Sequence, residues 1–267
     1  MIPHMSEYID IGVNLTGSSF NNDLDDVVQR ALDAGVSQMI VTGTDIHHSQ
    51  AALGLNRQYP GILMSTAGVH PHHASEFDAN TIPVLRDLCA EQSVVAVGEC
   101  GLDYNRNYSK PEQQRTAFEA QLQLACELRL PVFLHQRDAH DDFISMINEY
   151  SNELTGAVAH CFTGSEDEAL EYTGMGMYIG ITGWICDERR GGDLQQAVKS
   201  IPVDRIMLET DAPYLLPRDL QQEPVQKRRN EPCYLPHICQ VAANYMGIDD
   251  QQLGHAALEN SRRFFAI

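Results

Sequence analysis

The sequence has little positive charge. Lysine and arginine together number 18 against 37 aspartates and glutamates, which gives a net charge of −19 at pH 7. This balance excludes binding of nucleic acid through a broad basic surface, although bound divalent cations can supply the local positive charge that a phosphate needs. Only three lysines occur, and no Gly-Lys-Ser or Gly-Lys-Thr motif is present. A Schiff-base lysine and a P-loop are therefore both disfavoured.

The sequence also lacks the marks of export and of membrane insertion. Its start, MIPHMSEYID, has no basic residues followed by an apolar stretch, as a signal peptide would. No apolar run approaches the roughly 20 residues that span a bilayer. The seven cysteines form no CxxC pair and are odd in number, which indicates neither a disulfide framework nor a zinc ribbon and suits a reducing compartment. We therefore expect a cytoplasmic protein that does not bind membranes.

Short apolar runs alternate with helical patterns along the whole chain, which is the rhythm of βα units. No GxGxxG motif follows the first run, which weakens a dinucleotide-binding alternative. Eight runs predict a (β/α)8 TIM-type barrel with a single domain over residues 1–267. The predicted strands are Tyr8–Val13, Gln38–Thr42, Leu63–Gly68, Val94–Gly98, Val132–Leu134, Ala157–Ala159, Met177–Ile181 and Arg205–Leu208. The clearest predicted helices are Leu24–Ala34, Pro111–Leu128 with Ser109 as its cap, Leu235–Met246 and Gln251–Phe264.

Polar residues recur just after these strands. In a barrel the carboxyl ends of all strands meet at one mouth, where the catalytic groups of this fold lie. Residues that are distant in sequence would therefore be neighbours in space. We take Arg218–Glu231, after the eighth strand, as a long loop at this mouth, with a merely solvated loop as the alternative. The strand-end residues concerned are Asn14, His70, Glu99, His135, His160 and Asp211.

Four of these residues, namely Glu99, His135, His160 and Asp211, form a credible site for a divalent metal. Burying two carboxylates and two imidazoles together without a metal would be costly. A bound ion offsets that cost, lowers the pKa of water and polarises a phosphoryl or carbonyl oxygen. A lone histidine after a strand is more often a hydrogen-bonded structural residue, but packing does not readily explain four such residues at four strand ends. The sequence therefore predicts a metal-dependent hydrolase.

Four residues are candidates for binding the substrate, and the first of them is Asn14 at the end of the first strand. The Gly-Val-His-Pro turn would aim His70 into the pocket, where it would contact a phosphate. Arg137 would bind phosphate by a bidentate contact, as would Arg106, Arg228 and Arg229, yet each fits a surface ion pair equally well. Trp184, the only tryptophan, either stacks on a base or covers the end of the barrel.

Other residues near the predicted mouth have a simpler interpretation. Cys100 and Cys161 directly follow Glu99 and His160, and in a strand they would point to the opposite face, so we expect them to be packing residues. The pair at residues 47–48, two histidines, is expected to begin a surface helix rather than to reach the mouth.

Longer motifs extend over almost the whole chain, and together they are similar to one family, the TatD-type metal-dependent deoxyribonucleases of the amidohydrolase-like barrels. The motifs are GVHPH at Gly68–His72, GECGLDYNR at Gly98–Arg106, LH at Leu134–His135, HCFTG at His160–Gly164, IGITGW at Ile179–Trp184, ETDAPYLLPR at Glu209–Arg218 and RRNEP at Arg228–Pro232, with DIGVNLT at Asp10–Thr16 and CDERRG at Cys186–Gly191 in addition.

The resemblance implies an exonuclease that removes nucleotides from the 3′ end of single-stranded DNA, and also of RNA. It implies Mg²⁺ as the cofactor, with Mn²⁺ or Zn²⁺ as alternatives, and a role in the repair of oxidative DNA damage. On the matching positions Glu99, His135 and His160 would be metal ligands, and Asp211 would bind metal, orient the attacking water, or both. We expect the protein to act as a monomer.

The sequence departs from the family at the end of the first strand. Most relatives carry His-x-His there, whereas this chain has Gly12 and Asn14. Glycine has no side chain to ligate, and asparagine offers only a neutral carbonyl oxygen. The departure would weaken one of two metal positions and favour Mg²⁺ over zinc. One ion would then bind firmly, and a second would be recruited with the substrate phosphate.

The leading hypothesis is hydrolysis of phosphodiester bonds, with Glu99 in the catalytic site and Asp211 accepting a proton from the attacking water. The rival is an amidohydrolase-like enzyme that cleaves a small ester, lactone or amide at the same metal, because the barrel alone does not distinguish the two. A third hypothesis is a non-catalytic binding protein that lost activity with the first-strand histidines. The presence of all four strand-end residues is evidence against this third hypothesis.

Overall fold

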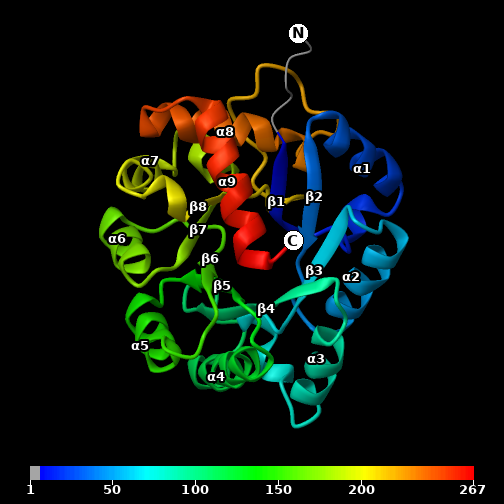
Figure 1. Ribbon diagram of the computed structural model, residues 1–267, viewed down its shortest axis with the longest axis vertical. Coiled ribbons are helices and arrows are strands. Elements are labelled where there is room, and N and C mark those ends of the chain that lie inside the picture. The colour runs from blue at the N-terminus through cyan, green and yellow to red at the C-terminus, as the bar shows by residue number, and fades with distance from the viewer. Residues whose placement is uncertain (1–6) are drawn as a thin grey trace. The chain divides into compact units, whose positions relative to one another are not determined.

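The computed structural model describes residues 7–267, and the first six residues, part of the N-terminal segment considered above, lie outside the described chain. Eight strands form one sheet whose order follows the chain from β1 to β8 (Figure 1). The strands β3 to β6 pair in parallel, as do β7 and β8. This is the order of a (β/α)8 barrel, and the fold-class prediction is confirmed. The strands are β1 (Tyr8–Val13), β2 (Val36–Val41), β3 (Leu63–Ala67), β4 (Val94–Asp103), β5 (Val132–Arg137), β6 (Ala157–Ala159), β7 (Tyr178–Ile181) and β8 (Ile206–Leu208).

Every strand is followed by a helix. The α-helices are α1 (Leu24–Asp33), α2 (Ile46–Gln58), α3 (Thr81–Cys89), α4 (Pro111–Leu128), α5 (His140–Tyr150), α6 (Glu166–Gly174), α7 (Gly192–Ala197), α8 (Leu235–Met246) and α9 (Asp250–Phe265). The 3₁₀ helices are η1 (Ser18–Phe20), η2 (Pro71–Glu76), η3 (Gly183–Cys186), η4 (Val203–Arg205) and η5 (Pro232–Tyr234). Across residues 7–267, no helix combines the length and the apolar character needed to cross a membrane.

The helix starts that the sequence predicts for α2 and α4 agree with the structure, but one predicted capping residue does not. Pro111 occupies the first turn of α4, where its missing N–H costs nothing. The two histidines at residues 47–48 lie in the first turn of α2, as predicted. The side chain of Asp45 caps this helix by accepting the N–H of His48. Ser109 does not cap α4. Its hydroxyl instead donates to the carbonyl of His72 and accepts the N–H of Ser75, both at 2.9 Å, so it joins α4 to η2.

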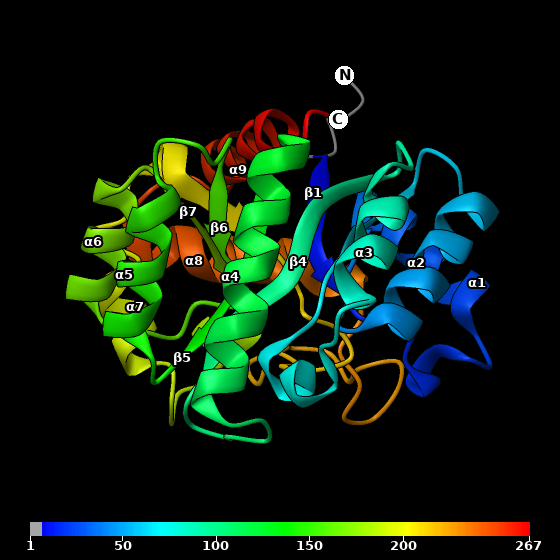
Figure 2. The same cartoon turned by 90° about the horizontal axis from the view of Figure 1, so that it is seen from below.

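The chain divides into two compact units, each of which is described by itself. One contains residues up to 40, 161–174 and 178–267, and the other contains 41–160 and 175–177. In the second unit Phe118 of α4 stacks on Phe143 of α5 with ring centroids 5.8 Å apart, and α4 lies along β4 (Figure 2). In the first unit Phe264 of α9 packs edge-on against Tyr178 of β7. A single domain over 1–267 stays a prediction.

Strand β4 is longer than the sequence predicts. The expected end at Gly98 is wrong, because the strand continues to Asp103 after a shift of register between Gly98 and Cys100. Gly98 and Gly101 both have φ of +139°, and a Cβ on either would collide with a backbone carbonyl oxygen of β5. Only glycine allows this close approach. Glu99 therefore lies on a bulge inside the strand rather than beyond its end.

The segment after β8 forms neither helix nor strand until η5 begins, and the predicted long loop at Arg218–Glu231 is confirmed. Buried Asn230 holds the loop, because its side-chain amide donates to the carbonyl of Thr210 at 2.9 Å. Its own N–H donates to the carbonyl of Pro213 at 3.0 Å.

Candidate active site

The bulge in β4 places the carboxylate at the centre of the site. Glu99 has no partner in the β4–β5 register, and its N–H instead donates to the carbonyl of Gly43 at 2.7 Å. The Glu99 side chain is buried, with only 5% of the residue exposed. A bulge commonly re-aims a side chain in this way, so the local backbone explains where the carboxylate points.

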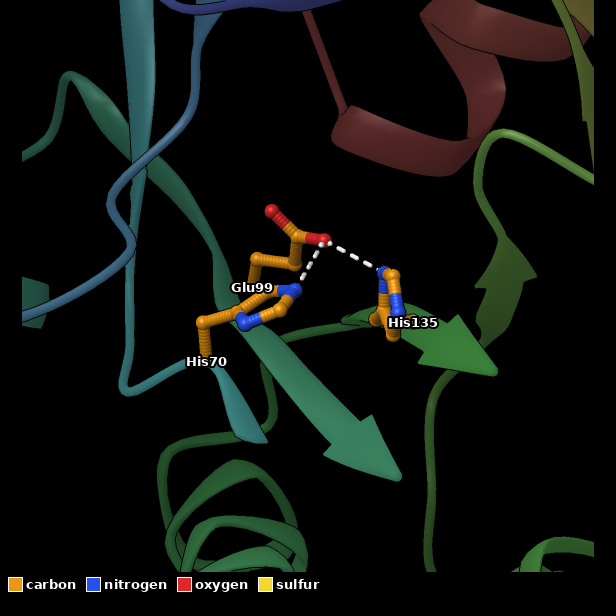
Figure 3. A group of neighbouring side chains, drawn as sticks. All are labelled: His70, Glu99 and His135. Atoms are coloured by element: carbon orange, nitrogen blue, oxygen red, sulfur yellow. Dashed lines mark hydrogen bonds and ion pairs between the residues drawn. The ribbon is translucent and has the colours of Figure 1, made fainter. Parts of the chain in front are cut away.

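Three imidazoles contact one oxygen of this carboxylate. The distances to Oε1 of Glu99 are 2.7 Å from Nε2 of His160, 3.0 Å from Nδ1 of His135 and 3.3 Å from Nε2 of His70. Figure 3 shows Glu99 between His70 and His135, with dashed lines to both. We call these four residues the Glu99 cluster. Three predicted strand-end residues and the predicted substrate contact thus lie together in one unit.

The charge of the Glu99 cluster follows from its burial and its contacts. Burial opposes ionisation of Glu99, but the imidazoles of His160 and His70, with hydrogen bonds from His135, hold the pKa of this carboxyl well below its usual range. Burial alone would lower the pKa of His135, whereas its contacts with Asp103 and Glu99 raise that pKa. The pocket therefore holds a carboxylate surrounded by groups that favour its charged form.

His70 differs from the other two histidines. Burial lowers its pKa to about 4, so the ring is neutral near pH 7. Its Nδ1 accepts the N–H of His72 at 3.1 Å. In the neutral ring the hydrogen must then be on Nε2, the atom that faces Glu99. In this tautomer His70 is a hydrogen-bond donor, and a cation at Nε2 would have to displace that hydrogen. The ligand atoms of His70, Glu99 and His135 do lie within 4.8 Å of one another.

Asp103 was not among the predicted site residues. It is 1% exposed, and its Oδ2 lies 2.7 Å from Nε2 of His72 and 3.5 Å from Nε2 of His135. Burial would raise the pKa of Asp103, but the interactions with His135 and His72 and the N–H of Arg106 hold it far below its usual range. A carboxylate behind a ligating histidine orients the ring. No local signal marked Asp103, because the predicted strand ended at Gly98 and the bulge at Glu99 interrupts the alternation of faces along β4.

The donor set of the Glu99 cluster fits a divalent cation. A carboxylate and two imidazoles, from Glu99, His135 and His160, are the ligands that divalent metals use in hydrolases. The buried Nε2 atom of His135 has no hydrogen bond, although Asp103 lies in ion-pair range. A cation ligated by Nδ1 of His135 would leave this atom free to carry a proton towards Asp103.

The fourth predicted ligand, Asp211, lies in the other unit. Its φ of 55° is left-handed, and its N–H donates to the carbonyl of Gly12 at 2.8 Å. Asn14 donates its side-chain amide to Oδ1 of Asp211 at 2.9 Å. Asn14 thus orients the Asp211 carboxylate.

Two buried carboxyls support the Asp211 segment, and both were missed as candidates. Asp10 is 0% exposed and accepts the N–H of Thr210 at 2.9 Å, while its second oxygen lies 2.5 Å from the Thr210 hydroxyl. Glu209 is equally buried and accepts the N–H of Cys161. The only signal in the sequence was the position of Glu209 two residues before Asp211.

The two cysteines beside the site differ from each other. Cys100 is fully buried on β4 and packs as predicted. Cys161 was predicted to point to the opposite face of a strand, and this argument is wrong. Strand β6 ends at Ala159, and Cys161 has a left-handed backbone conformation with φ of 47°. No strand alternation applies to it there, and it is only half-buried.

The predicted substrate contacts outside the Glu99 cluster have different surroundings. Arg137 ends β5, is exposed, and forms no ion pair within residues 7–267. Arg229, by contrast, pairs with Asp23 at 2.7 Å and with Glu231 at 2.6 Å, which supports the ion-pair interpretation for this residue. Trp184 is half-buried, and the guanidinium of Arg190 lies 4.3 Å from its ring centroid.

Comparisons with known proteins agree over nearly the whole chain. A family model described as TatD related DNase matches residues 9–266. A 3′-5′ ssDNA/RNA exonuclease TatD from Erwinia billingiae (strain Eb661) is 54% identical over 258 residues, which are 97% of this chain and 98% of that protein.

Solved structures share the fold. A hydrolase TatD family protein from Entamoeba histolytica has a TM-score of 0.89 at 28% identity and covers 97% of this chain and 98% of its own. A TatD homologue from Escherichia coli K12 has a TM-score of 0.88 at 28% identity, over 98% of this chain and 99% of its own.

Proposed function

The chain belongs to the family of TatD related DNases, and from this premise we propose that it is a 3′-5′ exonuclease that hydrolyses the phosphodiester bonds of single-stranded DNA and RNA. The observation that carries the proposal is the Glu99 cluster, in which one buried carboxylate oxygen faces three imidazoles at 2.7 to 3.3 Å. The same activity stands in the printed name of the Erwinia billingiae relative.

In this proposal Glu99, His135 and His160 hold a divalent cation. The cation supplies positive charge against the phosphate and lowers the pKa of water. Mg²⁺ is the ion we propose, because Gly12 and Asn14 replace two nitrogen ligands and leave a set richer in oxygen. Asp103 holds the ring of His135 in place from behind.

The remaining residues act on the substrate. The Nε2–H of neutral His70, which faces Glu99 when no substrate is bound, would turn to donate to a phosphate oxygen, and Arg137 would bind a second phosphate. For Asp211 we propose the role of proton acceptor, supported by the orientation that Asn14 gives its carboxylate. Trp184 would stack on a base near the end of the strand. None of the cysteines in residues 7–267 forms a disulfide, which supports the proposal of a reducing, cytoplasmic compartment. We propose in addition that the enzyme acts as a monomer.

The test uses single strands labelled at the 5′ end and incubated with Mg²⁺. We expect products that shorten stepwise from the 3′ end, and loss of at least about 100-fold of the rate in Glu99→Gln, which keeps the shape and removes the charge. The matched control is Glu91→Gln, because the exposed side chain of Glu91 pairs with exposed Arg57 at 2.9 Å and belongs to no part of the Glu99 cluster.

Unchanged release of nucleotides by Glu99→Gln would show that the assigned site is wrong. Inert DNA together with metal-dependent cleavage of an uncharged ester would instead point to an amidohydrolase-like enzyme. Both outcomes contradict the proposal.

A further inference from the structure

A second group of metal-ligating side chains lies outside the Glu99 cluster, within the unit that contains β7 and β8. It consists of Cys186 at the end of η3, Asp219 in the loop after β8, and His237 in the first turn of α8. One ligand atom of each residue lies within 4.8 Å of the other two. Three segments that are separate in sequence thus bring a sulfur, an oxygen and a nitrogen together.

Two of the three side chains are in direct contact, and the third lies close to both. Nε2 of His237 lies 2.7 Å from Oδ1 of Asp219, and the sulfur of Cys186 lies within 4.8 Å of a ligand atom of each. Cys186 is 5% exposed, whereas the Asp219 side chain is 47% exposed. The sulfur is therefore enclosed, and an ion could enter from the carboxylate side.

We propose that Cys186, Asp219 and His237 bind a divalent transition metal, and that Zn²⁺ is the ion that fits best. Thiolate and imidazole ligands select zinc over magnesium, and three protein ligands leave a fourth position for water. Ligand distances of about 2.0 to 2.3 Å in a tetrahedral zinc site bring neighbouring ligand atoms to about 3.3 to 3.8 Å. To reach this geometry the sulfur of Cys186 must approach by at most about 1 Å from the 4.8 Å limit, and the 2.7 Å pair of His237 and Asp219 must open by roughly 0.6 Å to admit the ion.

The charges of such a site balance. Burial, followed by the negative charge of Asp219, raises the pKa of the Cys186 thiol well above its usual range, so without a cation the sulfur keeps its proton. Binding of Zn²⁺ displaces that proton to solvent. One thiolate, one carboxylate and one neutral imidazole then neutralise the two positive charges.

The consequence of binding would be structural. Residues 209–231 form no helix or strand, and Asp219 lies within this segment. An ion shared with η3 and α8 would fix the loop at Asp219, near its middle. The inference does not depend on the proposed nuclease activity.

The experiment is a titration of the metal-stripped full-length chain with Co²⁺, which occupies zinc sites and reports a thiolate ligand through a sulfur-to-metal absorption band. The Glu99 cluster contains no sulfur, so the band is specific to the second site. We expect a band that saturates at one added equivalent for this site, disappears in Cys186→Ser and is displaced by Zn²⁺. Cys126→Ser is the matched control, because this half-buried thiol of α4 belongs to neither cluster.

Two further variants keep the test decisive. Asp219→Asn changes an exposed side chain, so its fold should survive, and we expect Co²⁺ affinity to fall at least tenfold while far-ultraviolet circular dichroism is unchanged. Glu99→Gln should keep the band and lose nuclease activity, which separates the two sites. Absence of the band in the unaltered chain, or its persistence in Cys186→Ser, overturns the inference.

The structural consequence has its own readout. Trypsin can cut the loop at Arg218, Lys227 and Arg228. We expect Zn²⁺ to slow these cuts at least several-fold in the unaltered chain but not in His237→Gln. Equal rates with and without Zn²⁺ would overturn the idea that the ion fixes the loop.

Discussion

At the scale of single residues, the tautomer of His70 separates binding of substrate from binding of metal. Its Nδ1 accepts a backbone N–H and its pKa of about 4 keeps it neutral, so Nε2 is a donor at neutral pH. We expect His70→Ala to raise KM for single strands about 10- to 100-fold, the worth of a hydrogen bond to a charged group. Metal stoichiometry should stay unchanged, and His70→Gln, which restores an N–H donor, should recover part of the loss.

Steady-state kinetics and calorimetric titration with Mn²⁺ check this prediction. The control is His73→Ala, because the side chain of His73 is 39% exposed and lies 4.0 Å from Asp45. A loss of metal binding in His70→Ala would mean that His70 is a ligand after all. Because the pKa of His70 lies near 4, its titration should not change activity between about pH 6 and 8.

Asp10 leads to a prediction about pH and stability. Burial raises the pKa of Asp10 well above its usual value. Hydrogen bonds from Thr210 and Gly12 lower this pKa, but they do not outweigh the effect of burial. The folded protein therefore keeps a proton that the unfolded chain releases above about pH 3.9. The free energy of unfolding must then fall as pH rises through this window, by up to about 1.4 kcal/mol per pH unit from this group.

Asp10→Asn removes the titration and keeps an acceptor for the N–H of Thr210. We expect the variant to gain stability relative to the unaltered chain as pH rises from 4 to 7, in urea unfolding followed by circular dichroism. A constant difference between the two proteins across this range would contradict the raised pKa. Asp10→Ala should be less stable at every pH, because it leaves the buried Thr210 groups without a partner.

The sequence identifies the residues of the Glu99 cluster because each follows an apolar run in a repeated βα pattern. Their meeting at one carboxylate oxygen agrees with that pattern, while their roles as ligands stay predictions. Asp103 and Asp10 escaped detection for a physical reason. Both are buried inside strands, and their importance depends on hydrogen bonds to residues far away in the chain, which no local pattern records.

At the scale of elements, β4 depends on glycine at two positions. A Cβ on Gly101 would collide with the carbonyl oxygen of His135, and the φ of +139° is itself unfavourable for any other residue. We expect Gly101→Ala to destabilise the fold by about 2 kcal/mol or more. Metal affinity should fall as well, because the backbone that carries His135 must move.

Thermal unfolding and metal titration of the same variant check both effects. Gly54→Ala is the control, because Gly54 lies on the exposed face of α2, where an added Cβ would meet no other atom within 4 Å. Alanine there should stabilise the helix by up to about 1 kcal/mol. Native-like stability and metal affinity in Gly101→Ala would show that the close approach of β4 and β5 does not position His135.

The same glycines explain where the prediction of elements failed. The bounds of β1, β6, α4 and α8 agree with the sequence to the residue, because apolar runs and helix-end residues mark them directly. In β4 the glycines at 98 and 101 are typical of a turn, and the sequence therefore placed the strand end too early. The backbone uses them instead for a bulge, and this choice depends on the neighbouring strand.

At the scale of the whole molecule, the order of the strands follows from sequence rhythm, whereas the conformation of the loop after β8 does not. Parallel strands joined by helices allow few arrangements, so eight βα units predict a barrel. The loop has no periodicity, and its path depends on particular contacts such as that of Asn230 with Thr210. Sequence patterns therefore predict the scaffold better than the segment that carries Asp211.

The net charge of −19 bears on how a polyanionic strand is held. A protein with so few cations should contact only the last nucleotides, through the bound ion, His70 and Arg137. The affinity for single strands falls with salt, and each phosphate contact contributes roughly −0.7 to the slope of log K against log salt concentration. At fixed Mg²⁺, two or three contacts therefore predict a slope of about −1.4 to −2.1.

Arg137→Ala should reduce the magnitude of this slope by about 0.7. Arg57→Ala, which removes a cation paired with Glu91 at 2.9 Å, should leave it unchanged. Fluorescence anisotropy of the unaltered metal site, with a strand whose 3′-terminal linkages cannot be hydrolysed, measures these slopes. A much steeper slope would require an extended basic path that a chain of this composition does not supply, and would contradict end recognition.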